Sequence, residues 1–269
     1  MDGQTVLITG ASGRIGVMLR TRLARPGRVL RLLDVVPPAP ASAGEAAEVL
    51  PAASVTDVAA MRRALDGADA VVHLGGIPVE DTWENILSVN IDGTRTVLEQ
   101  ARLAGVTRVV LASSNHAVGF VRRASWPDGE LPAGVPPRPD TYYGVSKVAM
   151  EALGSLYHSR FGMDVICLRI GTCEYTPPDT RSLSTWLSAD DMGRLAEAAI
   201  SAPAPAFRIV WGISHNTRRW WSLAEGEAIG YHPVDDAETY ADQVPVTGGH
   251  DTSGRIGGMF CNIPLGEPM

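Results

Sequence analysis

Residues 5–16 read Thr5-Val6-Leu7-Ile8-Thr9-Gly10-Ala11-Ser12-Gly13-Arg14-Ile15-Gly16. The apolar run is rich in β-branched residues and is typical of a buried strand, and the residues after Gly16 have helical spacing. A strand, a glycine turn and a helix in this order indicate a dinucleotide-binding unit, because glycines let the backbone approach a pyrophosphate at the helix N-terminus. The alternative is an ordinary strand–helix turn, although a second strand follows, as the nucleotide-binding interpretation requires.

The second expected strand covers residues 29–33 and ends at Asp34. A carboxylate at this position can accept hydrogen bonds from the ribose hydroxyls of a bound adenosine, and it repels a 2′-phosphate. Asp34 therefore predicts NAD rather than NADP as the cofactor. The alternative is that Asp34 only opens the loop 35–53, because aspartate often begins turns.

The composition is that of an ordinary globular protein, with 269 residues of which 45% are hydrophobic and 20% charged. A net charge of −7 without a basic stripe disfavours nucleic acid as a partner, and no apolar stretch is long enough to span a bilayer. No signal peptide is expected before the first strand. The three cysteines, Cys167, Cys173 and Cys261, lack zinc spacing, so we expect reduced thiols, a cytoplasmic location and no metal site.

Strand-like and helix-like segments alternate along most of the chain. Strands are expected at 29–33, 70–76, 108–112, 164–170 and 208–211, helices at 57–65, 83–104 and 189–201 and from Tyr143, a loop at 37–51, and a helix-like segment at 235–244. The alternation predicts an α/β fold, a Rossmann-type doubly wound parallel sheet with helices on both faces. We expect one domain over residues 1–269 with a small C-terminal substrate lobe, and substrate-binding elements mainly in 171–190 and 212–269.

Three short clusters follow expected strands, at the edge where ligands bind in a doubly wound sheet. Leu74-Gly75-Gly76 would let a cofactor lie close to the backbone. Ser113-Ser114-Asn115-His116 ends the next strand and Gly171-Thr172-Cys173 the one after. The Ser114 hydroxyl could bond a substrate oxygen. The alternative is a turn held together by its own Ser and Asn side chains.

The pentad Tyr143-Gly144-Val145-Ser146-Lys147 places a phenol and an ammonium four residues apart, on one side of a helix. A free tyrosine has a pKa near 10, and a nearby ammonium favours the phenolate and lowers that pKa. The pair therefore predicts a proton-transfer group, with surface packing as the alternative.

Taken together, these residues resemble the short-chain dehydrogenase/reductase superfamily in its extended branch. More narrowly, the chain is similar to the bacterial uronate dehydrogenases. The matching stretches are His73-Leu74-Gly75-Gly76-Ile77, Ser113-Ser114-Asn115-His116, Tyr143-Gly144-Val145-Ser146-Lys147, Arg169-Ile170-Gly171-Thr172-Cys173, Leu183-Ser184-Thr185-Trp186, Val210-Trp211-Gly212 and Trp220-Trp221. They follow one another over nearly the whole chain.

The resemblance implies oxidation of the cyclic form of D-glucuronate or D-galacturonate at C1, giving an aldarolactone and NADH. It implies that Tyr143 is the base, that Lys147 lowers the pKa of the phenol and holds the nicotinamide ribose, and that Ser114 steadies the reacting oxygen. Arg181 matches the family arginine for the substrate carboxylate, although a loop arginine is more often solvated. A homo-oligomer is expected by analogy with the superfamily.

The expected site comprises three sets of residues and no metal ligands. The catalytic residues are Tyr143, Lys147 and Ser114. The cofactor-binding residues are Gly10, Ser12, Gly13, Arg14, Ile15, Gly16, Asp34, Leu74, Gly75, Gly76, Tyr143 and Lys147. The substrate-binding residues are Ser114, Asn115, His116, Tyr143, Thr172 and Arg181, with polar packing as the alternative role for His116.

One position departs from the family pattern, because Pro78 stands where relatives often carry a serine that can touch substrate. Proline supplies neither a hydroxyl nor a backbone N–H, so this residue cannot make the substrate hydrogen bond of the family, which leaves the preferred sugar open. Two other functions stay open on the sequence. One is a sugar-nucleotide epimerase or dehydratase of the same superfamily, which usually needs a larger C-terminal domain, and the other is a non-catalytic NAD-binding protein.

Overall fold

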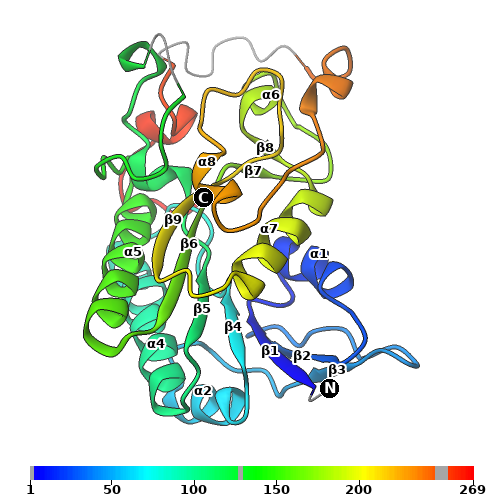
Figure 1. The fold of residues 1–269 in the computed structure, drawn as a ribbon. Coiled ribbons are helices and arrows are strands. Elements are labelled where there is room, and N and C mark those ends of the chain that lie inside the picture. The colour runs from blue at the N-terminus through cyan, green and yellow to red at the C-terminus, as the bar shows by residue number, and fades with distance from the viewer. Residues whose placement is uncertain (1–2, 127–129, 246–253) are drawn as a thin grey trace.

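A seven-stranded parallel sheet forms the centre of the protein in a computed structural model that describes residues 3–126, 130–245 and 254–269 (Figure 1). The strand order is β3-β2-β1-β4-β5-β6-β9. The strands are β1 (Gln4–Thr9), β2 (Arg28–Leu33), β3 (Ala47–Val49), β4 (Ala70–His73), β5 (Arg108–Leu111), β6 (Asp164–Ile170) and β9 (Phe207–Gly212). The order reverses beside β1, which confirms the predicted doubly wound α/β fold.

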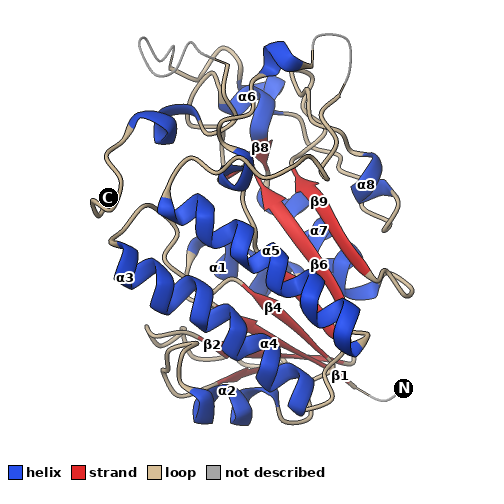
Figure 2. Cartoon of the chain, turned by 90° about the vertical axis from the view of Figure 1, so that its left-hand side faces the viewer, coloured by secondary structure: helices blue, strands red, loops and turns tan. Residues whose placement is uncertain are grey.

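Helices cover both faces of the sheet. On one face lie α1 (Arg14–Arg22) and α7 (Ala189–Ser201), which contact each other, and on the other lie α2 (Val58–Leu65), α4 (Gly93–Leu103) and α5 (Tyr142–Phe161), of which α4 and α5 cross the front of the sheet in Figure 2. Helix α4 continues α3 (Trp83–Asn85) and the π-helical turn η1 (Ile86–Asp92), as the predicted helix 83–104 requires. Two apolar layers, one on each face of the sheet, form the core.

Local capping explains where the main helices begin and end. The hydroxyl of Thr141 accepts a hydrogen bond from the Gly144 N–H at 3.0 Å, and α5 ends at Gly162, whose φ of 70° favours glycine. Ser188 caps α7 in the same way by accepting from the Asp191 N–H at 2.9 Å. These caps hold the helices in register with the strands that precede them.

A smaller layer lies beyond the carboxyl ends of the strands, at the top of Figure 1. It contains the parallel pair β7 (Thr172–Cys173) and β8 (Trp186–Leu187), the short helices α6 (Ser182–Thr185) and α8 (Ala224–Glu227), and the 3-10 turns η2 (Asn115–Val118), η3 (Arg123–Ser125), η4 (Ala237–Tyr240) and η5 (Gly258–Asn262). Trp221 stacks on Trp211 of β9 with ring centroids 4.3 Å apart, so this layer is packed directly onto the sheet.

Two secondary-structure predictions are wrong. Strand β3 lies within the segment expected to be a loop, because three half-exposed edge residues carry no readable periodicity. The segment 235–244 forms only the 3-10 turn η4, since the Asp236 carboxylate accepts from the Glu238 and Thr217 N–H groups and fixes a tight turn. Part of the range 212–269, residues 246–253, lies outside the described residues.

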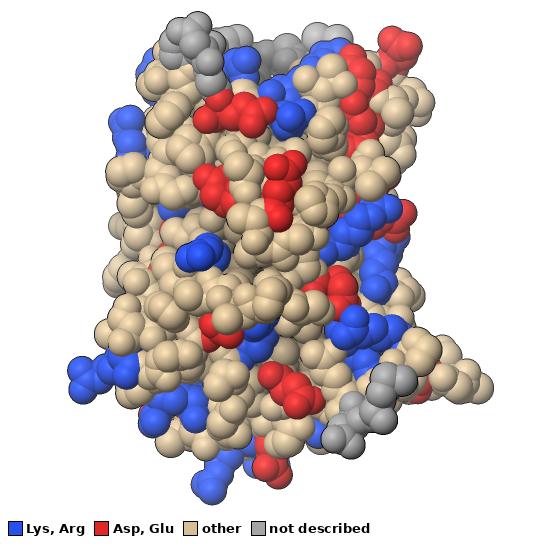
Figure 3. Space-filling view, in the orientation of Figure 1, with Lys and Arg blue, Asp and Glu red and all other residues tan. Residues whose placement is uncertain are grey.

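Acidic and basic side chains are interspersed on the face shown in Figure 3. Among the described residues, no helix combines the length and the apolar character needed to cross a bilayer. Within the same part of the chain, no group of three or more His, Cys, Asp or Glu side chains is arranged to hold a metal ion.

Candidate active site

The glycine turn between β1 and α1 has a geometry that larger residues could not adopt. Gly10 has a φ of 71°, and a Cβ there would lie 2.7 Å from the Gly75 N atom. A Cβ at Gly16 would lie 2.4 Å from the Gly10 carbonyl oxygen. Helix α1 starts after Gly13, which offers no side-chain cap, so its first backbone N–H groups stay available to an anion such as a pyrophosphate.

Asp34 lies beside this turn, at the end of β2. Its Oδ2 accepts from the Ser12 N–H at 2.9 Å, while Oδ1 accepts from the Val36 N–H at 3.2 Å. Asp34 therefore does begin a turn, as the alternative reading held. The same side chain also faces the cavity described next, so the two roles are compatible.

One cavity of about 840 Å³ at the carboxyl edge of the sheet collects all the predicted cofactor residues. Its lining includes Gly10, Ser12, Gly13, Arg14, Ile15, Gly16, Asp34, Leu74, Gly75, Gly76, Tyr143 and Lys147. Ser114 also lines it, as does Pro78, the residue that departs from the family pattern. The glycine edges, the Asp34 carboxylate and the free start of α1 fit a dinucleotide.

Tyr143 and Lys147 both lie in the first turns of α5, and both are nearly buried. The Lys147 Nζ donates to the Ala112 carbonyl at 2.8 Å, and it lies 5.2 Å from the centre of the Tyr143 ring. Tyr143 contacts the Ser114 side chain through a hydrogen bond that favours the phenolate. The structure thus brings the three predicted catalytic residues together beside the cofactor cavity.

The pKa of Tyr143 differs from the value expected from the sequence. The pKa of this phenol is raised to about 12. Burial is the main cause, the Ser114 hydrogen bond acts in the opposite direction, and the Asp140 charge adds a smaller increase. The expectation of a lowered phenol pKa is therefore wrong, because burial is the largest influence on it. Burial lowers the pKa of Lys147 itself to about 8, which leaves it mostly charged at neutral pH.

The other four predicted substrate residues lie around this cavity rather than in its lining. The Asn115 side chain donates to the Ile256 carbonyl at 3.1 Å, and the Arg181 guanidinium donates to the same oxygen. His116 Nδ1 lies 2.7 Å from Asp140 Oδ2, and the Thr172 and Thr185 hydroxyls are 2.9 Å apart. Asn115 and Arg181, distant in sequence, therefore converge on one backbone carbonyl.

Glu80 is a site residue that the sequence analysis missed. Its carboxylate is fully buried and accepts from the Tyr143 N–H at 2.9 Å, the Tyr142 N–H at 3.3 Å and the Gly266 N–H at 2.9 Å. A carboxylate at a helix N-terminus is favoured by the helix dipole. Glu80 therefore fixes the first turn of α5, and with it Tyr143, but a single acid in a loop carries no signal of this in the sequence.

A buried ion pair between Arg169 and Glu151 links the elements that carry the site. Arg169 donates through Nε and a terminal nitrogen to the two carboxylate oxygens of Glu151, both at 2.8 Å, and the Ser113 hydroxyl donates to Glu151 at 2.6 Å. The pair joins α5 to β6 and to the end of β5, so it holds the strand ends and the helix of the site in a fixed relation.

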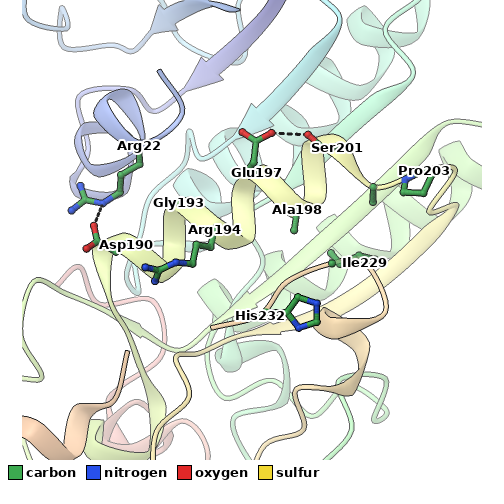
Figure 4. A pocket seen from close by; sticks show the side chains of 12 residues that line it. Arg22, Asp190, Gly193, Arg194, Glu197, Ala198, Ser201, Pro203, Ile229 and His232 are labelled. Carbon is green, nitrogen blue, oxygen red and sulfur yellow. Dashed lines mark hydrogen bonds and ion pairs between the residues drawn. The ribbon is translucent and has the colours of Figure 1, made fainter. Parts of the chain in front are cut away.

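A second cavity, of about 670 Å³, lies along α7 near His232 and is separate from this site (Figure 4). Arg22 and Asp190 pair across its rim at 2.7 Å, and the Ser201 hydroxyl donates to Glu197 at 2.6 Å. Arg194 pairs with Asp191 at 2.5 Å. Its arginines are engaged by acids of the chain itself, so the cavity presents no bare charge to a ligand.

The fold and the site together define an NAD-dependent enzyme of the Rossmann type, and comparison with known proteins agrees. The model of the NAD dependent epimerase/dehydratase family matches residues 6–200, so the chain belongs to this family. The uronate dehydrogenase of Pseudomonas putida is 42% identical to it over 235 residues, which are 87% of this chain and 85% of the relative.

Solved structures give the same result. The crystal structure of uronate dehydrogenase from Agrobacterium tumefaciens superimposes with a TM-score of 0.90 at 38% identity and covers 100% of both chains. A tyrosine-to-alanine mutant of the Agrobacterium tumefaciens uronate dehydrogenase, complexed with NAD, has a TM-score of 0.88 at 38% identity, covering 97% of this chain and 98% of the other. The predicted family resemblance and the predicted cofactor, NAD, are confirmed.

Proposed function

We propose that this protein oxidises a hexuronate, D-glucuronate or D-galacturonate, at C1 to the aldarolactone with NAD. The observation that supports this most directly is the position of Tyr143 and Ser114 at one end of the cavity that also contains the glycine turn and Asp34. A sugar held against these two hydroxyls would present its C1 to a dinucleotide lying along the strand ends. The names of the relatives supply the substrate class.

The chain's own residues have three tasks in this reaction. Ser114 holds the C1 oxygen, and its hydrogen bond to Tyr143 is the contact that favours the phenolate. Tyr143 takes the C1 hydroxyl proton as a positioned general base, a role that requires its pKa to be lower with the cofactor and sugar bound than the value of about 12 that burial gives it. Lys147 holds the nicotinamide ribose while its Nζ stays anchored on the Ala112 carbonyl. The hydride lost from C1 is accepted by the nicotinamide, chemistry that belongs to the bound cofactor.

Arg181 and Asn115 are proposed to bind the carboxylate that makes the substrate an anion. Both side chains converge on the Ile256 carbonyl, so their donors lie close together. A planar guanidinium matches a carboxylate in shape and charge. His116 and Thr172 are proposed to contact sugar hydroxyls, and Pro78 removes one hydrogen bond from the cavity wall. Residues 171–190 and 212–269 would thus carry most of the substrate contacts within one domain.

The direct test is to mix the purified protein with NAD and free D-glucuronate or D-galacturonate and to record NADH absorbance. We expect turnover with at least one uronate and far less with D-glucose, which lacks the carboxylate. UDP-glucuronate serves as the probe for the sugar-nucleotide alternative. Activity on the nucleotide sugar with none on either free uronate would overturn the proposal, and NAD binding without any turnover would favour a non-catalytic role.

We also propose a homo-oligomer in the cytoplasm. Cys167 and Cys173 are buried as free thiols, which suits a reducing compartment. The oligomer is proposed from the superfamily alone. Light scattering of the purified protein gives the molar mass in solution, and a mass of one 28.6 kDa chain would contradict it.

A further inference from the structure

Asp140 is a buried carboxylate that neither the sequence motifs nor the proposed chemistry uses. It lies directly before the cap of α5, and its side chain has no solvent exposure. Oδ2 lies 2.7 Å from His116 Nδ1, and Oδ1 accepts from the Thr141 hydroxyl at 3.0 Å. Each carboxylate oxygen therefore has a distinct partner, and one partner is a predicted substrate residue.

Three glycines from separate parts of the chain make room for this carboxylate. A Cβ at Gly119 or at Gly257 would lie 1.9 Å from Asp140 Oδ2, and a Cβ at Gly144 would lie 2.9 Å from Oδ1. No real Cβ tolerates such distances to a buried oxygen that is fixed from both sides. The turn after β5, the catalytic helix and the C-terminal segment are therefore all built around Asp140.

The imidazole of His116 is held on its remaining sides as well. Its ring packs against Phe260 with centroids 4.1 Å apart and meets the Tyr143 ring edge-on at 5.7 Å. The His116 side chain is 13% exposed, and its Nε2 makes no hydrogen bond to any residue in 3–126, 130–245 or 254–269. Nε2 is thus the ring nitrogen that remains for a ligand.

We infer that Asp140 is a positioning residue that keeps the proton of neutral His116 on Nδ1 and so presents Nε2 as a hydrogen-bond acceptor for a hydroxyl of the sugar. In a neutral imidazole one nitrogen donates and the other accepts, so an anionic acceptor at Nδ1 decides the role of Nε2. The inference rests on the proposed uronate oxidation, and it adds that the site reads a hydroxyl of the sugar as well as its carboxylate.

Asp140→Asn is the most informative change. The Thr141 oxygen accepts from the Gly144 N–H and gives its own proton to residue 140, so the new amide oxygen will face Thr141. The amide NH₂ then faces His116 Nδ1, which must become the acceptor, and the ring proton moves to Nε2. We expect kcat/KM for the uronate to fall roughly 10-fold, mainly through KM, with NAD affinity unchanged.

A double-mutant cycle tests whether Asp140 acts through His116. If it does, Asp140→Asn costs less than about 2-fold in a His116→Gln background, because the group it positions is gone. An equal loss in both backgrounds would overturn the inference. The inference would also be overturned if Asp140→Asn changed only the pH profile of the rate. The Asp140 charge also raises the pKa of Tyr143, so such a result would mean that it acts on the phenol and not through His116. Asp92→Asn, at an exposed acid that ends η1 and pairs with Arg95, is the matched control.

The tautomer can be read without any activity measurement. We expect the ¹⁵N spectrum of histidine-labelled wild-type protein at about pH 9 to contain an Nδ1–H histidine signal that disappears in His116→Gln. The Nδ1–H signal of His158, whose Nδ1 donates to the Met163 carbonyl at 2.8 Å, should remain in both proteins. The His116 signal would stand even if the protein proved inactive on uronates, so it separates this inference from the proposed function. An Nε2–H tautomer for His116 in the wild type would refute the inference. Because this measurement uses the wild-type protein, it remains decisive even if Asp140→Asn fails to fold.

Discussion

The two halves of the candidate site are built in different ways. The half that faces the cofactor consists of backbone at strand ends, with Gly10, Gly16 and Gly75 packed so closely that no side chain fits between them. The half proposed to face the sugar consists of side chains such as Asn115 and Arg181, which are held by the carbonyl of Ile256 from the C-terminal segment. The first half depends on local sequence and the second on contacts between distant segments.

This difference indicates how each half can change. A strand–turn–helix unit that holds a pyrophosphate through its backbone leaves little freedom to its sequence. Side chains tethered to a loop carbonyl can be exchanged with smaller consequences for the fold. We therefore expect changes of substrate to arise in the second half. The following variants test that separation, with the effects on activity in order of decreasing size and one stability measurement among them.

Tyr143→Phe removes the phenol hydroxyl that is proposed to contact both the cofactor and the sugar. We expect turnover to fall roughly 10²-fold to 10⁴-fold, because the C1 proton loses its acceptor, while NAD affinity changes little. Stopped-flow or steady-state NADH formation gives the rate, and fluorescence titration gives NAD binding. Tyr142→Phe, one residue earlier and bonded through its backbone only, is the control. Comparable rates for Tyr143→Phe and the wild type would mean that another group takes the proton.

Arg181→Ala should affect only the sugar half. Loss of a charged hydrogen bond to the carboxylate is worth about 2 kcal/mol, which corresponds to a KM for the uronate raised roughly 30-fold. The dissociation constant of NAD should stay within about 2-fold of the wild type. Arg63→Ala, on the exposed side of α2, is the control. An unchanged uronate KM would exclude Arg181 as the carboxylate ligand.

Glu80→Ala tests how precisely the first turn of α5 must be held. The variant leaves the Tyr143 N–H without its buried partner, so we expect roughly a 10-fold loss in kcat and a loss of about 1 kcal/mol in the free energy of unfolding. Glu80→Gln, which retains an oxygen acceptor, should recover part of the rate. If both variants unfold more easily yet turn over at the wild-type rate, Glu80 serves stability alone.

The burial of Lys147 determines whether the free energy of unfolding rises or falls with pH. Its pKa is lowered to about 8 in the folded protein, against 10.5 when unfolded, so above pH 8 the unfolded chain binds the extra proton. Stability relative to Lys147→Met should therefore rise between pH 8 and 10.5, by on the order of 3 kcal/mol. Urea unfolding of both proteins across this range measures it. If the stability of the wild type relative to Lys147→Met decreased with rising pH, the lowered pKa of Lys147 would be contradicted.

Asp34→Ser is expected to give the smallest effect, in the cofactor half only. Without the carboxylate, the repulsion of a 2′-phosphate is lost, so the preference for NAD over NADP should narrow by roughly 10-fold, with the uronate KM unaltered. Initial rates with the two cofactors provide the ratio. Because the Ser12 N–H also loses its acceptor, Asp34→Asn serves as the variant that keeps this hydrogen bond. If the ratio of the NAD and NADP rates were unchanged in both Asp34 variants, Asp34 would not determine the choice of cofactor.

The sequence predicted most residues of the cavity at the strand ends, because they lie in short runs that directly follow strands. The run Thr5–Gly16, the acid at the end of β2 and the Gly75 turn each lie beside a strand that periodicity detects. The helix at 189–201 was also predicted with its observed ends. Strand β3 was missed because three residues at a sheet edge are too few to show a pattern.

The sugar half was predicted only through the family resemblance. Arg181 and Asn115 meet at Ile256, which is 75 residues from the first and 141 from the second along the chain, and no local pattern encodes such a contact. The pKa of Tyr143 was mispredicted for a related reason. The spacing to Lys147 is readable in the sequence, but the burial that dominates the titration depends on the packing of the whole molecule.

The glycines around Asp140 have a consequence for mutational variation in this lineage. Gly119, Gly144 and Gly257 are each compatible with the carboxylate only while they lack a side chain. Alanine in place of the aspartate would relieve the crowding only at Gly257. A Cβ at Gly119 would still lie 2.7 Å from the Cβ of residue 140, and a Cβ at Gly144 would still lie 2.5 Å from the His116 carbonyl oxygen. Aligned orthologues should therefore keep glycine at positions 119 and 144 whichever residue stands at 140, and position 257 should vary only together with position 140.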